Sequence, residues 1–207
     1  MNFLFFDCET TGKPKVYNAS YEDVDNWPRV TQLAWMLCDA NGNIISQRQN
    51  LIMPDGWEVP NEEFFINNNM STERCLNFGK LILGELEALM EAKLQAEFLV
   101  AHNLNFDHRV VWAEFIRAGI EPKRGMVKIC TMMKSTKHCN LPNPKGYGAP
   151  KWPKLEELHR KLFNKDFDGA HDALADVIAM KDCFFELVKL GVIVPELPTA
   201  VPDNKIN

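Results

Sequence analysis

Runs of apolar residues near the N-terminus predict a three-stranded β-meander. Residues 2–8 (NFLFFDC) form a short apolar run ending in an acid, which is typical of a buried strand with a polar group at its carboxyl end. Residues 29–39 and 43–52 flank Ala40-Asn41-Gly42, and an Asn-Gly pair between β-patterned segments favours a tight hairpin. Three consecutive antiparallel strands are therefore expected before residue 54.

The pattern becomes helical after a connection at residues 54–60 that contains proline and glycine. Large apolar residues recur every three to four positions from Leu81 to Leu94, which predicts an amphipathic helix. The last helix, at about 170–190, has a predicted buried stripe of Leu174, Val177, Ile178, Phe184, Leu187 and Val188. The other elements expected are a strand at 97–101, a helix at 106–118, a strand at 126–132, a proline-rich loop at 140–153 and a helix at 153–163.

The order of these elements predicts the fold class. A meander followed by alternating helices and strands is expected to form an α/β domain with a mixed central sheet. Such a sheet is antiparallel in its meander and parallel further on, with helices covering its faces. The 207-residue chain fits one domain, which we assign to residues 1–193. Residues 194–207 contain three prolines and are interpreted as a loosely held tail.

Composition narrows the class of protein. The chain is 46% hydrophobic and 25% charged, as in ordinary soluble domains, and its apolar runs are far shorter than the roughly 20 residues that cross a bilayer. The N-terminus lacks the basic and apolar regions of a signal peptide. Six cysteines without a CxxC pair are typical of reduced intracellular thiols. We therefore expect a cytoplasmic protein with no membrane attachment.

The charge is unevenly distributed. A net charge of −5 does not by itself favour nucleic acid as a partner. Residues 123–165, however, contain eleven lysines and arginines and only two acids, Glu156 and Glu157. Such a stretch is either a solvated loop or a surface that faces phosphates. Tyr147 and Trp152 within it are candidates for stacking on bases.

Two acids end the first predicted strand. Residues two apart in a strand project from the same face, so Asp7 and Glu9 are expected to point the same way. Burying two like charges is costly unless a cation neutralises them, and oxygen ligands suit Mg²⁺ or Mn²⁺. A strand that emerges into solvent would give the same pattern, so the pair alone leaves both interpretations open.

Two later segments contain further candidate residues for metal binding or catalysis. Asp107 lies near the start of the predicted helix 106–118, where acids also serve as helix caps. In the segment AHDALAD, Asp176 lies beside the apolar positions of the last helix, and Asp172 is interpreted as a capping or solvent-facing acid. His171 fits either a surface histidine or a general base, because the ordinary pKa of imidazole is close to neutral pH.

In combination these segments resemble the DnaQ-like, or DEDDh, family of 3′→5′ exonucleases, and in particular exonuclease domains of the DNA polymerase III epsilon type. Three motifs carry the resemblance: FFDCETTG at 5–12, LVAHNLNFD at 99–107 and HDALAD at 171–176. The His-x4-Asp spacing is that of the branch with histidine in place of tyrosine. Softer matches are PRVTQLAW at 28–35 and KICTM at 128–132. Three ordered motifs across residues 2–190 are far more specific than one.

The resemblance implies an RNase H-like fold and a role for each motif residue. Asp7, Glu9, Asp107 and Asp176 would bind two divalent ions, Mg²⁺ or Mn²⁺, and His171 would be the general base. Contacts with the substrate would come from Cys8, Thr10, Thr11, Asn103, Phe106 and His171. The implied reaction is hydrolysis at the 3′ end of single-stranded nucleic acid, with release of 5′-mononucleotides.

The sequence leaves more than one substrate and more than one partner as alternatives. DNA is favoured, in proofreading or DNA processing, with a polymerase or a replication or repair complex as an expected partner. An exoribonuclease resembling oligoribonuclease or RNase T is the alternative, because no short motif shows how the 2′-hydroxyl is treated. A non-catalytic adaptor would be expected to lack a carboxylate or the histidine, and all five are present. Loops 13–28 and 140–153 exceed the family minimum and are candidates to border the cleft.

Overall fold

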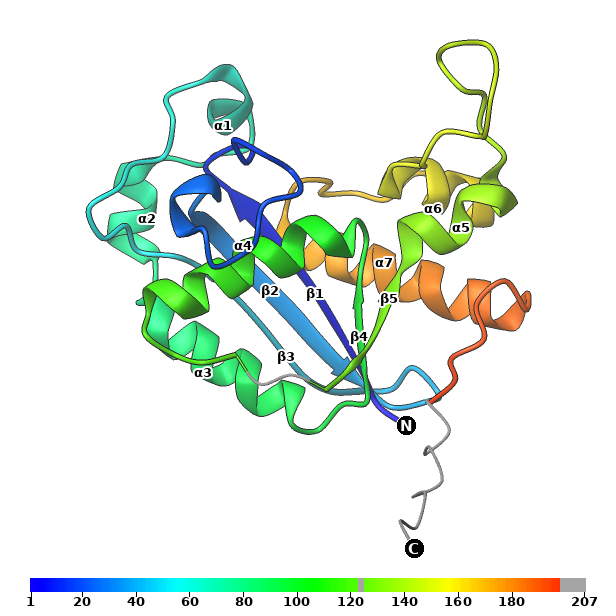
Figure 1. The fold of residues 1–207 in the computed structure, drawn as a ribbon, viewed down its shortest axis with the longest axis horizontal. Helices are drawn as coiled ribbons and strands as arrows, with labels where there is room; N and C mark the ends of the chain where they lie inside the picture. Colours follow the sequence, from blue (N-terminus) through cyan, green and yellow to red (C-terminus); the bar gives the residue numbers. More distant parts are fainter. Residues whose placement is uncertain (123–124, 198–207) are drawn as a thin grey trace, which may run out of the picture.

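The computed structural model describes residues 1–122 and 125–197 and contains a five-stranded mixed sheet (Figure 1). The strands are β1 (Phe3–Thr10), β2 (Val30–Cys38), β3 (Ile44–Leu51), β4 (Phe98–Ala101) and β5 (Val127–Cys130), in the spatial order β3-β2-β1-β4-β5. β1 and β2 are antiparallel, as are β2 and β3, whereas β1, β4 and β5 are mutually parallel. This arrangement confirms the predicted fold class.

Helices cover both faces of the sheet (Figure 1). Their bounds are α1 (Glu63–Asn67), α2 (Thr72–Phe78), α3 (Ile82–Lys93), α4 (Leu104–Arg117), α5 (Thr131–Cys139), α6 (Leu155–Phe163) and α7 (Ala173–Lys189), with a 3₁₀ turn at Val24–Asn26. Strand alternation divides the core between two layers. Phe5 packs edge-on against Phe184 of α7, whereas its neighbour Phe6 contacts Trp112 of α4.

Three helices were not predicted. α1 and α2 contain five and seven residues, which is too short for a helical period to stand out. α5 begins at Thr131, inside the predicted strand 126–132, and the strand itself covers only Val127–Cys130. KICTM therefore forms a strand-to-helix junction, which a run of apolar and β-branched residues does not reveal.

The predicted apolar stripes are wrong in part. Leu83 and Leu94 of the α3 region are exposed, whereas Glu85 is buried because Arg48 on β3 binds its carboxylate with two nitrogen–oxygen distances of 2.8 Å. In α7 the buried side passes through Val177 and Met180, which leaves Ile178 exposed. A periodic pattern identifies a helix, but an ion pair between the helix and a strand also decides which side of the helix faces inward.

Loop 13–28 packs on α4. Arg109 donates hydrogen bonds to the carbonyl oxygens of Tyr17 and Ala19, and Arg117 donates to that of Trp27. None of the described residues of this loop lines the cleft presented below, so the expectation that it borders that cleft is wrong.

The C-terminal region beyond α7 is described up to residue 197. Ile193 belongs to the hydrophobic core, and most of the predicted tail 194–207 lies outside the described residues. Within the described part of the chain, every helix is too short or too polar to span a bilayer.

Candidate active site

Three chain segments that are far apart in the sequence meet in one cleft of about 540 Å³. The segments are the end of β1, the junction of β4 and α4, and the start of α7. Loop 140–153 and the beginning of α6 complete the walls. Predicted site residues that line the cleft are Asp7, Cys8, Glu9, Asn103, Phe106, Asp107, His171 and Asp176.

β1 supplies the first two carboxylates. Asp7 and Glu9 continue the alternation of Phe3 and Phe5, so both point toward the α7 layer. Cys8 between them points the other way, and its thiol donates a hydrogen bond to Asp107 Oδ1 over 3.5 Å. The end of β1 therefore lies beside acids from both helical layers, Asp107 of α4 and Asp176 of α7.

The junction of β4 and α4 positions Asp107. Asn103 adopts a left-handed backbone conformation with φ 71°, which asparagine tolerates better than most residues, and α4 begins directly after it. His102 fixes the turn, because its two ring nitrogens lie 2.9 Å from Thr131 Oγ1 and 3.0 Å from the carbonyl oxygen of Pro153. Asp107 therefore lies in the first turn of α4 and is only 4% exposed.

The start of α7 is anchored to the sheet through Asp172. Its carboxylate accepts hydrogen bonds from the backbone N–H of Ala175, as a helix cap, and from the side chains of Gln32 and Gln49. The capping role predicted for Asp172 is confirmed. The helix begins at Ala173 rather than at about 170, so His171 lies in the turn before it, with φ 72°.

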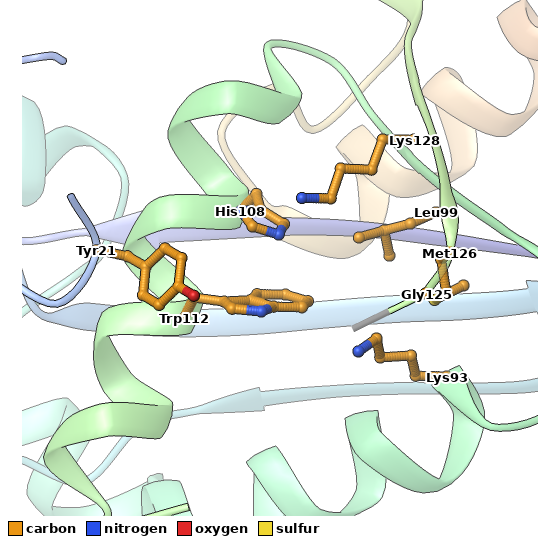
Figure 2. Close-up of a pocket in the computed structure, with 8 residues that line it drawn as sticks. All are labelled: Tyr21, Lys93, Leu99, His108, Trp112, Gly125, Met126 and Lys128. Carbon is orange, nitrogen blue, oxygen red and sulfur yellow. The ribbon is translucent and has the colours of Figure 1, made fainter. Parts of the chain in front are cut away.

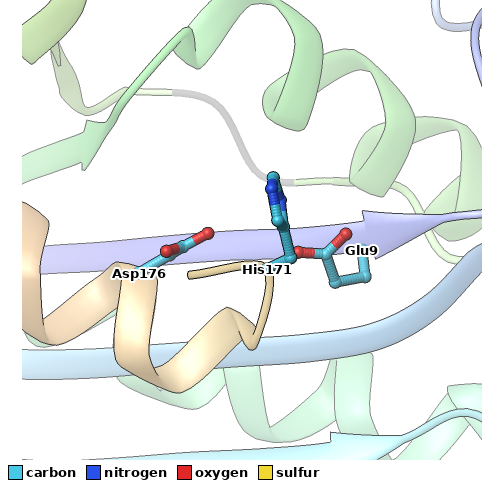
Figure 3. Close-up of side chains that lie close together, drawn as sticks. All are labelled: Glu9, His171 and Asp176. Atoms are coloured by element: carbon cyan, nitrogen blue, oxygen red, sulfur yellow. The ribbon is translucent and has the colours of Figure 1, made fainter. Parts of the chain in front are cut away.

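His171 lies between two carboxylates (Figure 3). One ring nitrogen and one carboxylate oxygen from each of Glu9 and Asp176 all lie within 4.8 Å of one another. On its other side the exposed imidazole meets the ring of Phe64 of α1 edge-on, with 5.4 Å between centroids. The short helix α1, which the sequence pattern did not indicate, thus reaches the candidate base.

Burial, and to a lesser degree the charges of neighbouring acids, disfavours ionisation of the carboxylates in the cleft. Burial, together with the charges of Asp107, Asp176 and Glu9, raises the pKa of Asp7 well above its ordinary value. Burial and the neighbouring acids raise the pKa of Glu9 to about 8. Burial also raises the pKa of Asp107 to about 7, although the hydrogen bond from Cys8 opposes that shift. The pKa of Asp176 rises to about 7 for the same main reason, burial.

This donor set fits divalent cations. Four carboxylates that resist ionisation side by side are stabilised in their charged form when positive charge lies between them. Oxygen ligands are those that Mg²⁺ and Mn²⁺ prefer. Asp7, Glu9, Asp107 and Asp176 are the residues that would hold the ions.

Two residues predicted to contact the substrate do not line the cleft, and several residues that line it had no predicted role. Thr10 and Thr11 are not among the residues lining the cleft; the Thr11 hydroxyl accepts a hydrogen bond from the backbone N–H of Arg29. Their contact with a nucleotide stays a prediction. Cleft residues that had no assigned role are His102, Met132, Pro153, Lys154, Leu155 and Glu156. Trp152 also lines the cleft, whereas Tyr147 does not.

The raised pKa values predict a stability that depends on pH and metal. Because the folded-state pKa values of Glu9, Asp107 and Asp176 lie above the ordinary ones, the folded state binds more protons between about pH 4 and 8. The free energy of unfolding of the metal-free protein should therefore fall as pH rises through this window.

Mg²⁺ or Mn²⁺ should reverse that loss at pH 8. At a free ion concentration 100-fold above Kd the gain is about 2.7 kcal/mol, which corresponds to roughly 5–10 °C in Tm for a domain of this size. Thermal unfolding in EDTA and in added metal measures both effects. A Tm that is insensitive to metal at pH 8 would contradict the assignment of these carboxylates.

Similarity to known proteins is found at the level of structure. No family model matches the chain, and no curated protein matches its sequence. Among solved structures, exonuclease I has a TM-score of 0.68 at 19% identity over 91% of this chain and 41% of its own. E. coli exonuclease I in complex with a dT13 oligonucleotide gives 0.68 at 20% identity, over 91% and 41% of the two chains. A product-bound structure of exonuclease I gives 0.69 at 18% identity, over 91% and 43%.

These similarities concern the fold. The chain shares the RNase H-like fold of exonuclease I and spans less than half the length of those proteins. The predicted RNase H-like fold is thereby confirmed.

Proposed function

We propose that this chain is a metal-dependent 3′→5′ exonuclease that hydrolyses single-stranded DNA from its 3′ end and releases 5′-mononucleotides. One observation carries the proposal: all five motif residues, four carboxylates and His171, line the same cleft. The fold is that of exonuclease I, which has been solved with dT13 and dA16 oligonucleotides. The 3′→5′ direction of digestion is proposed because the sequence motifs resemble those of 3′→5′ exonucleases. DNA is favoured as the substrate because the oligonucleotides in those structures are DNA.

The proposed roles follow from position. Asp7, Glu9, Asp107 and Asp176 would hold two divalent ions, and these ions, when bound, would polarise the scissile phosphate and stabilise the charge on the leaving oxygen. His171 takes a proton from the attacking water, whose oxygen forms the new bond to phosphorus. The bond to the 3′-oxygen of the preceding nucleotide breaks, so the phosphate stays on the 5′-oxygen of the released nucleotide. Cys8, Asn103 and Phe106 shape the wall beside the terminal nucleotide.

The strand beyond the terminal nucleotide is proposed to follow the rim formed by Trp152 and Lys154. Both line the cleft, and both belong to the basic stretch 123–165. An indole that is 63% exposed offers a stacking surface for a base, and the ammonium group of Lys154 suits a backbone phosphate. Only part of the basic stretch serves this purpose, because Lys128 lies at another cavity and Lys151 pairs with Glu157 at 2.5 Å.

Digestion of end-labelled oligonucleotides tests the function. Single-stranded DNA labelled at its 5′ end should give a descending ladder, and DNA labelled at its 3′ end should release a labelled mononucleotide at once. EDTA should stop both reactions. Duplex DNA and RNA of the same sequence test strandedness and sugar preference, and faster digestion of RNA would favour the exoribonuclease alternative. Absence of hydrolysis with either Mg²⁺ or Mn²⁺ would exclude the proposed enzyme. A proofreading role beside a polymerase stays a prediction of the sequence resemblance.

Trp152 provides a prediction with a matched control. Trp152→Ala should raise KM for single-stranded DNA about tenfold with little change in kcat, because stacking of one base on an aromatic ring contributes about 1–3 kcal/mol. Tyr147→Ala removes another exposed aromatic ring from the same loop, 76% exposed but outside the cleft, and should change KM less than about twofold. Equal effects of the two substitutions would show that the strand does not follow this rim.

A further inference from the structure

Gln32 on β2 ties the start of α7 to the sheet. Its side-chain oxygen accepts a hydrogen bond of 3.0 Å from the backbone N–H of Ala173, the first residue of α7. Its side-chain nitrogen donates over 3.0 Å to the carboxylate of Asp172, the residue before. The side chain is only 7% exposed, so both ends of a buried amide are bound by two consecutive residues. This pairing fixes where the helix begins.

Gln49 on β3 holds the same carboxylate from a second strand. Its side-chain nitrogen donates to the same oxygen of Asp172 over 2.7 Å. The other carboxylate oxygen of Asp172 caps α7 through the backbone N–H of Ala175. We call Gln32, Gln49 and Asp172 the amide clamp. It joins the first turn of α7 to two neighbouring strands at once.

The amide clamp lies on the same face of the sheet as the cleft. Gln32 is the register partner of Glu9, and partners in antiparallel strands project from the same face with Cβ atoms roughly 5 Å apart. A separate cavity of about 460 Å³, lined by Leu99, lies on the opposite face (Figure 2), because the neighbouring Phe98 stacks on Phe3 in the α7 layer. The clamp glutamines line neither cavity, so they act on the cleft only through the residues that they hold.

The residues beside the clamp are the candidate base and a candidate metal ligand. His171 directly precedes Asp172 and has φ 72°, a conformation that is unfavourable for histidine and persists only where neighbouring contacts impose it. Asp176 lies one turn later, and its backbone N–H donates to the carbonyl oxygen of Asp172 over 3.0 Å. A ring nitrogen of His171 and carboxylate oxygens of Glu9 and Asp176 lie within 4.8 Å of one another. A shift of α7 against β2 would therefore move two functional groups away from Glu9 together.

We propose that the amide clamp sets the positions of His171 and Asp176 relative to Glu9, with Gln32 as its main positioning residue. This inference rests on the proposed exonuclease function, because it assigns the clamp a part in that reaction. Residues that orient metal ligands through hydrogen bonds typically change metal affinity or activity by about 10- to 100-fold when they are replaced. A displacement of about 1 Å in a reacting group can have an effect of similar size.

Gln32→Met removes both hydrogen bonds and keeps nearly the length and volume of the side chain. In this variant kcat for single-stranded DNA should fall about 30-fold or more, with KM changed less than about threefold. Calorimetric titration of the protein alone should show Mn²⁺ binding about tenfold weaker. Gln47→Met is the control, because Gln47 is an exposed glutamine of β3 that does not line the cleft. It should leave kcat and Mn²⁺ affinity unchanged, and circular dichroism at the assay temperature checks that each variant is folded.

An exchange of the two groups in the clamp tests the contact itself. Gln32→Glu alone places two carboxylates against each other, and Asp172→Asn alone places amide nitrogens against an amide nitrogen. Each should lower kcat at least about tenfold. Gln32→Glu combined with Asp172→Asn exchanges carboxylate and amide without altering the net charge, and asparagine is also a good helix cap. The double variant should recover kcat to within about threefold of the unmodified protein, which two independent effects would not produce.

A role confined to folding gives a different result. It would lower Tm in Gln32→Met but leave kcat and Mn²⁺ affinity of the folded protein within about twofold, and that outcome overturns the inference. A double variant no more active than either single variant also overturns it. An unmodified protein that binds Mn²⁺ but does not hydrolyse DNA would refute the exonuclease function and not the clamp. In that case the Mn²⁺ affinity of Gln32→Met decides: weaker binding supports the clamp, and unchanged binding overturns it.

Discussion

Asp7→Asn is expected to lower kcat for hydrolysis of single-stranded DNA by about 10³-fold or more, while the protein stays folded. A loss of that size corresponds to about 4 kcal/mol of the activation barrier, which is the scale of a bound metal's contribution to charge stabilisation. Among the four acids, Asp7 is the one whose pKa is raised by burial and by the charges of Asp107, Asp176, Glu9 and Asp172 together. It is thus the carboxylate that most needs cations, and the one whose loss most weakens their binding.

The same substitution should stabilise the metal-free protein. Asparagine has nearly the shape of aspartate but no charge, so it removes the repulsion among the buried acids without leaving a hole. In EDTA at pH 8 the Tm of Asp7→Asn should therefore exceed that of the unmodified protein, and added Mg²⁺ should raise it less. Loss of activity together with higher stability separates a metal ligand from a residue that only supports the fold.

Asp182→Asn is the matched control. Asp182 is an acid of α7 that pairs with Lys181 on the surface and does not line the cleft. Its substitution should leave both kcat and the response of Tm to metal unchanged, because exposed ion pairs contribute little. An Asp7→Asn protein with nearly full activity would contradict the site assignment. A lower Tm in EDTA would instead indicate that the charge of Asp7 is balanced within the protein itself.

Much of this site could be predicted from the sequence because its residues lie at the ends of regular elements. The alternation within β1 placed Asp7 and Glu9 on one face, and the structure agrees. The short apolar run before His102 predicted a strand, and Asp107 follows it in the first turn of a helix. Local pattern is sufficient where one strand or one helix turn fixes the direction of a side chain.

The contacts that hold the site together could not be predicted. Asp172 is fixed by Gln32 and Gln49, about 120 to 140 positions earlier in the chain, and glutamines in strands have no pattern that would reveal such a contact. The edge-on contact of Phe64 with His171 depends on a five-residue helix. The stripe of α3 was misjudged because the partner of Glu85, Arg48, lies on another element. Each failure concerns a long-range polar or aromatic contact.

The two cavities also show why the net charge is a poor guide. The acids gathered at Asp7, Glu9, Asp107 and Asp176 contribute to the overall charge of −5, yet that cluster is where divalent cations and the scissile phosphate are proposed to meet. Lys154 and Lys128, both from the basic stretch, lie at different cavities on the two faces of the sheet. The charge that a ligand meets must therefore be judged from the residues that line each cavity, and not from the net charge of the chain.

His171→Ala is expected to reduce kcat by about 10²- to 10⁴-fold, the usual scale for loss of a general base, with metal affinity largely retained. The exposed imidazole lies beside the carboxylates of Glu9 and Asp176, so it can reach a water held there. Turnover on single-stranded DNA and calorimetric titration with Mn²⁺ measure the two effects separately.

His171→Asn separates loss of the imidazole from strain in the backbone. Residue 171 has φ 72°, and asparagine adopts this left-handed conformation more readily than alanine. Both substitutions remove the base, so both should lower kcat to a similar degree, and a large recovery in His171→Asn alone would attribute the loss to the backbone. The proximity of a ring nitrogen to Glu9 and Asp176 also allows His171 to be a metal ligand. In that case calorimetric titration with Mn²⁺ would show affinity falling at least about tenfold in both variants, and the role of base would pass to another group.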